Sequence, residues 1–173
     1  MGSSFMIFVS VGTHEQPFTR LIKHIDELKG SEIINQEVFI QKGFTSYVPK
    51  NCKSETLVDY ETMLRMVETA NIFITHGGPG NLFVGWMYKK IPIVVPRNSI
   101  YGEHVDDHQI DFVRRLEKEN KIVAIYDILN MRGVIEKYEA NKLVKNTFYK
   151  ENISIIKLAK KIDDYCKDFS LKL

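Results

Sequence analysis

The stretch Asn71–Asn81, with the sequence NIFITHGGPGN, joins an apolar run to a helical pattern through a turn that contains three glycines. The β-branched and aromatic residues Ile72–Thr75 are typical of a buried strand, and Leu82–Lys89 is predicted to be a helix. A strand that ends at glycines and restarts as a helix leaves backbone N–H groups pointing outward, with the helix dipole behind them. Such groups bind anions, most often phosphates, and glycines let the anion approach closely. The stretch therefore predicts a phosphate site.

Neither of the two common glycine fingerprints is present in this turn. A dinucleotide pattern G-x-G-x-x-G from Gly78 would need glycine where Phe83 stands, and a P-loop from Gly80 would need lysine where Trp86 stands. We therefore expect a diphosphate cradle of another kind. The alternative is a tight strand-to-helix connection without a ligand.

The length and composition limit the classes of protein to consider. The chain has 173 residues, of which 44% are hydrophobic and 27% charged, as in a soluble globular domain. The net charge of +2 gives no argument for nucleic acid or for a membrane surface. Cys52 and Cys166 lie far apart, so we expect reduced thiols, no disulfide and a cytoplasmic protein. No apolar run approaches the roughly 20 residues of a membrane span.

Apolar runs alternate with helical patterns along one predicted domain, residues 6–173, after a short start at residues 1–5. The predicted strands are Met6–Val11, Val38–Ile40, Thr56–Val58, Ile72–Thr75, Ile91–Val95 and Lys121–Ile125. The predicted helices are Phe18–Leu28, Tyr60–Ala70, Leu82–Lys89, His108–Leu116, Ile128–Tyr138 and an amphipathic tail, Glu151–Phe169. This alternation predicts an α/β fold with an open, mostly parallel, Rossmann-like sheet and helices on both faces.

Three polar loops follow predicted strands: Gly12–His14, His76–Asn81 and Arg97–Gln109. Ligands of open α/β sheets bind outside the carboxyl ends of the strands, where the strand order reverses. We therefore expect the three loops to form one site. Within it, Thr13 either donates its hydroxyl to a phosphate or caps the next helix.

The third loop carries several groups that suit a nucleoside. Glu103 can accept hydrogen bonds from ribose hydroxyls, and the amide of Gln109 can pair with a ribose or a base edge. His104 and His108 are four residues apart and could share a metal ion, but no third ligand is evident, so no metal is expected. Alternatively, a neighbouring aspartate caps the following helix and both histidines are surface residues.

Two further histidines and one arginine lie next to the predicted phosphate site. His76 and His14 are expected to donate to an anion or to hold a loop rather than to take a proton, although His14 remains a candidate base. Arg97 either pairs with a diphosphate or has an exposed role.

With these loops placed, the chain resembles the C-terminal, nucleotide-sugar-binding half of family 28 glycosyltransferases of GT-B fold. It is most similar to the small catalytic chain of two-chain transferases, which act in the dolichol pathway or in bacterial capsule and exopolysaccharide synthesis. The resemblance covers about Met6 to Phe169, and the motifs that carry it are VSVGTHEQPF (9–18), ITHGGPGN (74–81), IPIVVPR (91–97) and GEHVDDHQ (102–109).

The resemblance implies a role for each loop. Gly12 and Thr13 would face the diphosphate. Many family members have a glutamate on the helix after the glycine turn that holds the ribose, and the equivalent position here is Gly85, which shifts this contact to the third loop. The cradle would comprise Gly77, Gly78, Gly80 and Asn81, and the nucleoside would be surrounded by Glu103, His104, His108 and Gln109.

The resemblance further implies an inverting, metal-independent transferase subunit without a cofactor, for which a UDP-sugar is the donor substrate. It would pass a hexose to a polyprenyl-diphosphate-linked acceptor. A membrane-associated partner chain would bind that acceptor and supply the base, so that this chain lies at the inner membrane face through its partner. Self-association of the isolated chain is left open. The alternatives are a non-catalytic nucleotide-binding or enhancer subunit and a sugar-nucleotide epimerase of related fold.

Overall fold

One parallel sheet organises the part of the chain that the structure, a computed structural model, describes, residues 5–140. The strand order is β3-β2-β1-β4-β5-β6, and every neighbouring pair is parallel. The strands are β1 (Met6–Ser10), β2 (Glu37–Gln41), β3 (Lys53–Glu55), β4 (Ile72–Thr75), β5 (Ile93–Val94) and β6 (Val123–Ala124). The predicted α/β fold with an open parallel sheet is confirmed.

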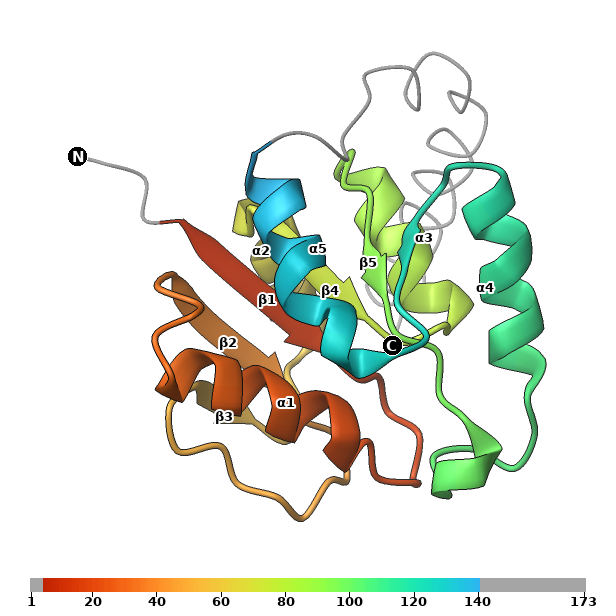
Figure 1. Ribbon diagram of the computed structural model, residues 1–173, viewed down its shortest axis with the longest axis horizontal. Coiled ribbons are helices and arrows are strands. Elements are labelled where there is room, and N and C mark those ends of the chain that lie inside the picture. The colour runs from red at the N-terminus through yellow and green to blue at the C-terminus, as the bar shows by residue number, and fades with distance from the viewer. Residues whose placement is uncertain (1–4, 141–173) are drawn as a thin grey trace, which may run out of the picture.

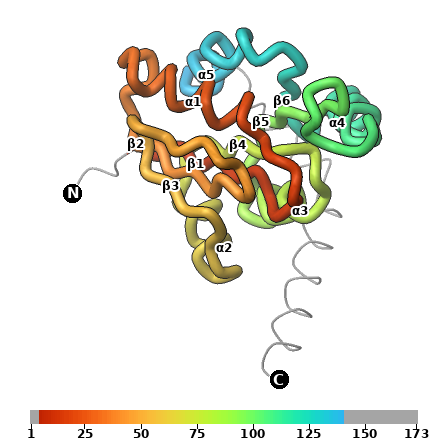
Figure 2. Tube along the Cα trace, turned by 90° about the horizontal axis from the view of Figure 1, so that it is seen from below, coloured from red at the N-terminus to blue at the C-terminus, as the bar shows by residue number. Residues whose placement is uncertain are grey.

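Helices cover both faces of this sheet (Figures 1 and 2). Helices α1 (Thr19–Gly30) and α5 (Met131–Glu139) lie on one face. Helices α2 (Tyr60–Thr69) and α3 (Pro79–Met87) lie on the other, and α4 (His108–Lys118) packs against α3. Two short 3₁₀ turns, η1 (Ser99–Tyr101) and η2 (Ile128–Asn130), complete the described elements. None of the helices within residues 5–140 is both long and apolar enough to cross a membrane.

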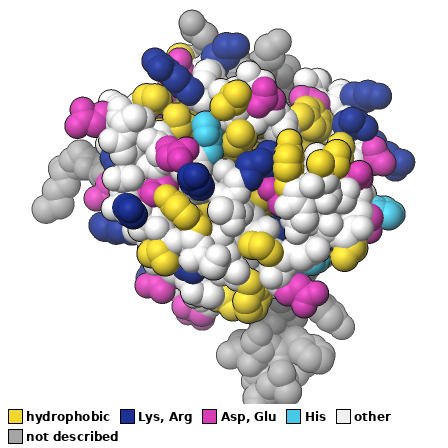
Figure 3. Space-filling view, turned by 60° about the horizontal axis from the view of Figure 1, so that its bottom comes forward, with side chains coloured by type: hydrophobic (Ala, Val, Ile, Leu, Met, Phe, Trp, Pro, Cys, Tyr) yellow, Lys and Arg dark blue, Asp and Glu magenta, His cyan; other side chains and the backbone are white. Residues whose placement is uncertain are grey.

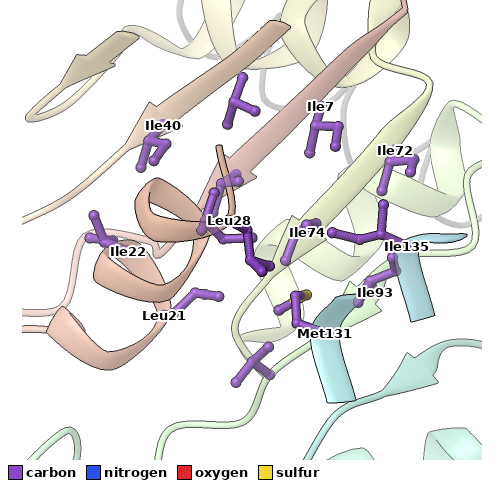
Figure 4. Close-up of a cluster of buried hydrophobic side chains, with 14 of the residues drawn as sticks. Ile7, Leu21, Ile22, Leu28, Ile40, Ile72, Ile74, Ile93, Met131 and Ile135 are labelled. Atoms are coloured by element: carbon purple, nitrogen blue, oxygen red, sulfur yellow. The ribbon is translucent and has the colours of Figure 1, made fainter. Parts of the chain in front are cut away.

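The apolar strands are explained by packing on both faces of the sheet. Along β1, Ile7 and Val9 join the cluster with α1 and α5, whereas Phe8 faces α2 and stacks on Phe73 with ring centroids 5.7 Å apart. Figure 4 shows the first cluster, in which isoleucines of four strands meet side chains of α1 and α5. A strand covered on both sides has no position for a solvent-facing polar residue, so its sequence is continuously apolar.

Several predicted elements differ from the observed ones in their bounds. Strand β3 lies at Lys53–Glu55 rather than at Thr56–Val58, because it is a polar edge strand without an apolar run to mark it. Helix α3 begins at Pro79 rather than at Leu82, because proline fits the first helical position, where no N–H is needed. Strands β5 and β6 occupy only the middle of their predicted ranges. The predicted helix at residues 151–169 lies outside the described residues.

The strand order reverses between β1 and β4. From β1 the chain continues to β2 on one side, whereas β4 continues to β5 on the other. The loops that leave β1 and β4 therefore separate at this point, and the crevice between them is where a ligand binds in folds of this kind.

Candidate functional site

An open cavity of about 570 Å³ lies at the carboxyl ends of β1 and β4. The carboxyl ends of these strands point toward the lower side of the molecule in Figure 1. Figure 3 brings this side forward, and on the face that it shows hydrophobic side chains lie among charged ones. One side of the cavity is formed by Gly12, Thr13 and the glycine turn, as we call residues 76–81. Most of the remaining lining, which we call the apolar wall, consists of Val58, Tyr60, Met63, Phe83, Val84 and Met87. The cavity thus combines a polar end and an apolar wall.

The N-terminus of α3 forms the floor of the polar end. Gly78 is the N-cap residue, Pro79 follows it, and no side chain caps the helix. The N–H groups of Gly80 and Asn81 lie in the first helical turn, where no intrahelical acceptor exists. A β-carbon placed on Gly80 would meet no atom within 4 Å, so this part of the turn is open to the cavity. An anion there would receive N–H donors and the positive end of the helix dipole.

His76 is enclosed by the backbone on both sides, which explains two of the glycines. A β-carbon on Gly78 would lie 2.2 Å from its Nε2 atom, and one on Gly12 would lie 2.5 Å from its Cε1 atom. Burial, followed by the charge of Arg97, lowers the pKa of His76 to about 3, so the ring is neutral. The hydroxyl of Thr75 donates to the carbonyl of Ser10 at 2.8 Å, so its 3.3 Å contact with Nδ1 requires Nδ1 to be the donor. These contacts favour the loop-holding role of His76 over donation to an anion.

A small polar network lies beneath the glycine turn. The amide nitrogen of Asn81 donates to the hydroxyls of Ser10 and Thr75, both at 2.9 Å, and Ser10 is 3.4 Å from the side-chain oxygen of Gln41. Ser10, Gln41 and Thr75 were not among the predicted site residues. Each is a polar residue at the carboxyl end of an apolar strand, and this position is the sequence feature that could have indicated a place at the site. The network ties the start of α3 to the ends of three strands.

Arg97 is 1% exposed and does not face the cavity. Its guanidinium donates to backbone carbonyls of Val11 at 2.9 Å, Gln16 at 2.7 Å and Glu103 at 2.9 Å. Burial lowers its pKa to about 10, against the opposing charge of Glu103, and the group stays cationic at neutral pH. Neither expected role, a diphosphate contact or an exposed position, matches this structure. Arg97 holds the first loop to the third.

Glu103 is also buried, at 3% exposure, and its carboxylate is already engaged. Both oxygens accept from Arg20 at 2.9 Å, and one also accepts from the backbone N–H of Asn98 at 3.0 Å. Arg20 of α1 was not predicted, because nothing in a helical pattern shows which exposed arginine will meet a distant carboxylate. The expected contact of Glu103 with a ribose stays a prediction, and it would require this ion pair to open.

Gln109 connects the third loop to the glycine turn. Its side-chain oxygen accepts from the N–H of Gly77 at 3.2 Å and from that of Arg97 at 3.3 Å. A β-carbon on Gly77 would lie 2.9 Å from Val113 and 3.1 Å from Gln109, so this glycine packs against α4 rather than facing the cavity. Both residues support the turn from behind.

The remaining histidines lie at the edge of the site. The rings of His14 and His104 have centroids 4.8 Å apart, which brings the first and third loops together. The Nδ1 atoms of His104 and His108 lie 3.2 and 2.8 Å from the same oxygen of Asp106. Within residues 5–140, no group of three or more His, Cys, Asp or Glu residues is arranged to hold a metal ion.

The predicted site residues therefore fall into two groups. The structure brings all of them to one edge of the sheet, but only some line the cavity: Gly12, Thr13, His76, Gly78, Gly80 and Asn81. The others lie behind it or beside it: His14, Gly77, Arg97, Glu103, His104, His108 and Gln109.

Val84 of α3 lines the cavity, whereas its neighbour Gly85 does not. A β-carbon on Gly85 would lie 2.8 Å from Pro92 and 3.2 Å from Phe73, so this position points toward the sheet. Of these two neighbouring positions, a side chain that contacts a nucleoside would therefore be at position 84.

Comparison with known families gives one match. The family described as "Glycosyltransferase family 28 C-terminal domain" matches residues 6–164, which is most of the chain. No match is found among curated proteins.

Solved structures to which the chain is similar include glycosyltransferases. They include the glycotransferase of kitacinnamycin (TM-score 0.63, 16% identity, 91% of this chain and 39% of that one). The calicheamicin glycosyltransferase CalG4 has a TM-score of 0.59 at 11% identity, over 96% of this chain and 44% of that one. The glycosyltransferase SnogD from Streptomyces nogalater has a TM-score of 0.56 at 14% identity, over 99% of this chain and 45% of that one. The present chain spans less than half the length of each of these three proteins.

Proposed function

The chain belongs to the glycosyltransferase family 28 C-terminal domain family, and from this premise we propose that it binds the UDP-sugar donor of an inverting glycosyltransferase. The observation that carries the proposal is the cavity, in which an uncapped helix N-terminus faces an apolar wall. A diphosphate suits the first feature and a nucleoside the second. A volume of about 570 Å³ is in the usual range for a small-molecule site.

The chemistry follows from where charge develops during transfer. When the bond between the anomeric carbon and the diphosphate oxygen breaks, negative charge grows on the leaving diphosphate. The N–H groups of Gly80 and Asn81 are fixed at the start of α3, and Thr13 is exposed and lines the same cavity. Fixed donors stabilise the developing charge more than the ground state, which lowers the barrier. In this scheme these N–H and hydroxyl groups stabilise the leaving diphosphate, which is the role that a metal ion has in other transferases.

The acceptor in our proposal is a sugar linked to a polyprenyl diphosphate in polysaccharide synthesis, bound by a membrane-associated partner chain. The base that deprotonates its hydroxyl comes from that partner or from His14. Burial, His104 and Arg97 lower the pKa of His14, so its ring is neutral at pH 7 and able to accept a proton. In support of this role, His14 directly follows Gly12 and Thr13, which line the cavity, and its ring contacts that of His104.

The proposal is tested by calorimetric titration of the full chain with UDP, in the presence of magnesium and in the presence of a chelator. We expect saturable binding that the chelator does not change. Metal-dependent binding would contradict the metal-independent scheme and would direct attention to His104 and His108.

A pair of glycine variants tests the cradle itself. Gly80 and Gly133 are both helical, and a β-carbon on either meets no atom within 4 Å, so leucine fits at both positions in the free chain. We expect Gly80→Leu to abolish UDP binding, because the side chain would occupy the place of the phosphate, and Gly133→Leu on α5 to leave binding unchanged. Retained UDP affinity in Gly80→Leu would overturn the cradle.

The alternative is a non-catalytic nucleotide-binding subunit, and one observation favours keeping it. Glu103 and Gln109 brace the loops, so their presence alone does not require catalysis. Sugar transfer by the chain together with its partner, measured for the wild type and for Gly80→Leu, separates the two. Transfer that survives in Gly80→Leu would favour the non-catalytic subunit.

A further inference from the structure

We propose that the cavity holds the donor nucleoside against the apolar wall without using the ribose 2′-hydroxyl, so that 2′-deoxynucleoside diphosphates bind as well as UDP. The inference rests on the proposed function, because it names the class of nucleotide for the same site. It concerns the apolar part of the cavity lining.

The apolar wall is a packed surface built from two helices and the loop before them. Met63 of α2 and Met87 of α3 are buried, at 8% and 7% exposure, and Met87 packs with Leu64. Phe83 is held edge-on against Trp86, with ring centroids 5.5 Å apart and planes at 88°. An aromatic ring and two thioethers offer contact to the flat face of a base and to the carbons of a sugar.

Two polar side chains next to this wall, Asp59 and Gln41, already contact other groups of the protein. Asp59 stands between Val58 and Tyr60, and its two oxygens accept from the N–H and the hydroxyl of Thr62, both at 2.8 Å, which caps α2. The side-chain oxygen of Gln41 is 3.4 Å from the hydroxyl of Ser10.

Carboxylates are the groups that commonly read ribose hydroxyls in α/β nucleotide sites. Asp59, which is next to the wall in sequence, caps α2, and Glu103 is held by Arg20. The α3 side chains of the wall, Phe83, Val84 and Met87, carry no oxygen or nitrogen that could bind a hydroxyl. Contact with the wall therefore depends on the base and on the carbon skeleton of the sugar, which UDP and dUDP share.

Titration of the full chain with UDP and with dUDP tests the inference, because the two nucleotides differ only in the 2′-hydroxyl. We expect dissociation constants within about twofold of each other, since a hydroxyl that stays in solvent contributes little. Affinity for dUDP more than about tenfold weaker would overturn the inference and leave the proposed function standing, because this is the effect of losing one hydrogen bond to a charged group. Binding of neither nucleotide would overturn both.

A gain of discrimination provides a second, independent test. Val84→Glu places a carboxylate on the face of α3 toward the cavity, and Val84→Gln places a neutral side chain of the same shape there. We expect Val84→Glu to prefer UDP over dUDP by about tenfold and Val84→Gln to prefer it by much less, because a charged acceptor binds the hydroxyl more strongly. Equal affinity of Val84→Glu for UDP and dUDP, in a variant with unchanged circular dichroism, would contradict a sugar placed against this wall.

Discussion

The glycine turn and the third loop, residues 97–109, both follow a strand of the same sheet and both carry polar residues, but the turn has three glycines and the third loop has one. The turn opens to the cavity through Gly78, Gly80 and Asn81. Two polar side chains of the third loop point inward, where Arg97 and Glu103 are 1% and 3% exposed. Two loops at one sheet edge thus have different tasks, one facing the cavity and the other holding the loops around it.

The difference shows how a binding surface made of backbone atoms is kept in place. N–H groups can bind an anion only if the loops that carry them have one fixed conformation, and glycine-rich loops have high conformational entropy when unfolded. The guanidinium of Arg97 and the amide of Gln109 supply the fixing contacts from behind. The following predictions test this division, from the largest expected effect to the smallest.

Replacing Arg97 by methionine should destabilise the chain by about 3–5 kcal/mol, because several buried carbonyls would lose their donor. Arg97→Lys should recover part of this loss, since an ammonium keeps the charge but cannot reach all of the carbonyls. Urea unfolding measures both, with the exposed Arg114→Met as the control. A loss below about 1 kcal/mol would show that Arg97 is not the brace described here.

Adding a methyl group at two nearby glycines should affect the stability of the chain differently. Gly78→Ala should destabilise the chain by about 1–3 kcal/mol, because its β-carbon would lie 2.2 Å from Nε2 of His76. Gly80→Ala should leave stability nearly unchanged, since no atom lies within 4 Å. Thermal unfolding of the two variants provides the comparison, and equal melting temperatures would contradict the placement of His76 between Gly12 and Gly78.

His76 should make stability depend on pH. Its folded pKa of about 3 is below the ordinary value of 6.5, so the unfolded chain binds a proton first as the pH falls. Its contribution is complete above pH 6.5 and decreases toward pH 3, by up to about 1.4 kcal/mol per pH unit. Urea unfolding at pH 7 and pH 5 should therefore show a smaller difference for His76→Gln than for the wild type. An identical pH dependence in the two proteins would be evidence against a buried neutral ring.

Glu103→Gln should destabilise the chain by about 1 kcal/mol, because the ion pair with Arg20 becomes a neutral hydrogen bond. If Glu103 only braces the loop, the affinity for UDP should change by less than about threefold. A much larger loss of UDP affinity with unchanged stability would show that the carboxylate contacts the nucleoside, as first expected from the sequence.

Much of this organisation could be predicted from the chain alone. The apolar runs at β1, β2 and β4 and the helical patterns of α1, α2 and α4 are present in the sequence because each element buries a fixed set of positions. The edge strand β3 could not be found in this way, because its side chains are polar and only its backbone joins the sheet. Among the site residues, the location of the glycine turn at 76–81 was predictable, because glycines mark the break between a strand and a helix. The packing of Gly77 against α4 and of Gly78 against His76 was not, because both contacts depend on the folded structure.

The sequence by itself determined the kinds of element, their order and the glycine turn that faces the cavity, since these depend on local periodicity and backbone freedom. The tertiary structure decided which polar residues face the cavity and which brace the loops. Arg97, Glu103 and Gln109 have the chemistry for either task. They brace the loops because the fold brings backbone carbonyls, N–H groups and Arg20 within their reach. Arg20 is 83 residues from Glu103 in sequence, and a contact over such a separation leaves no local pattern.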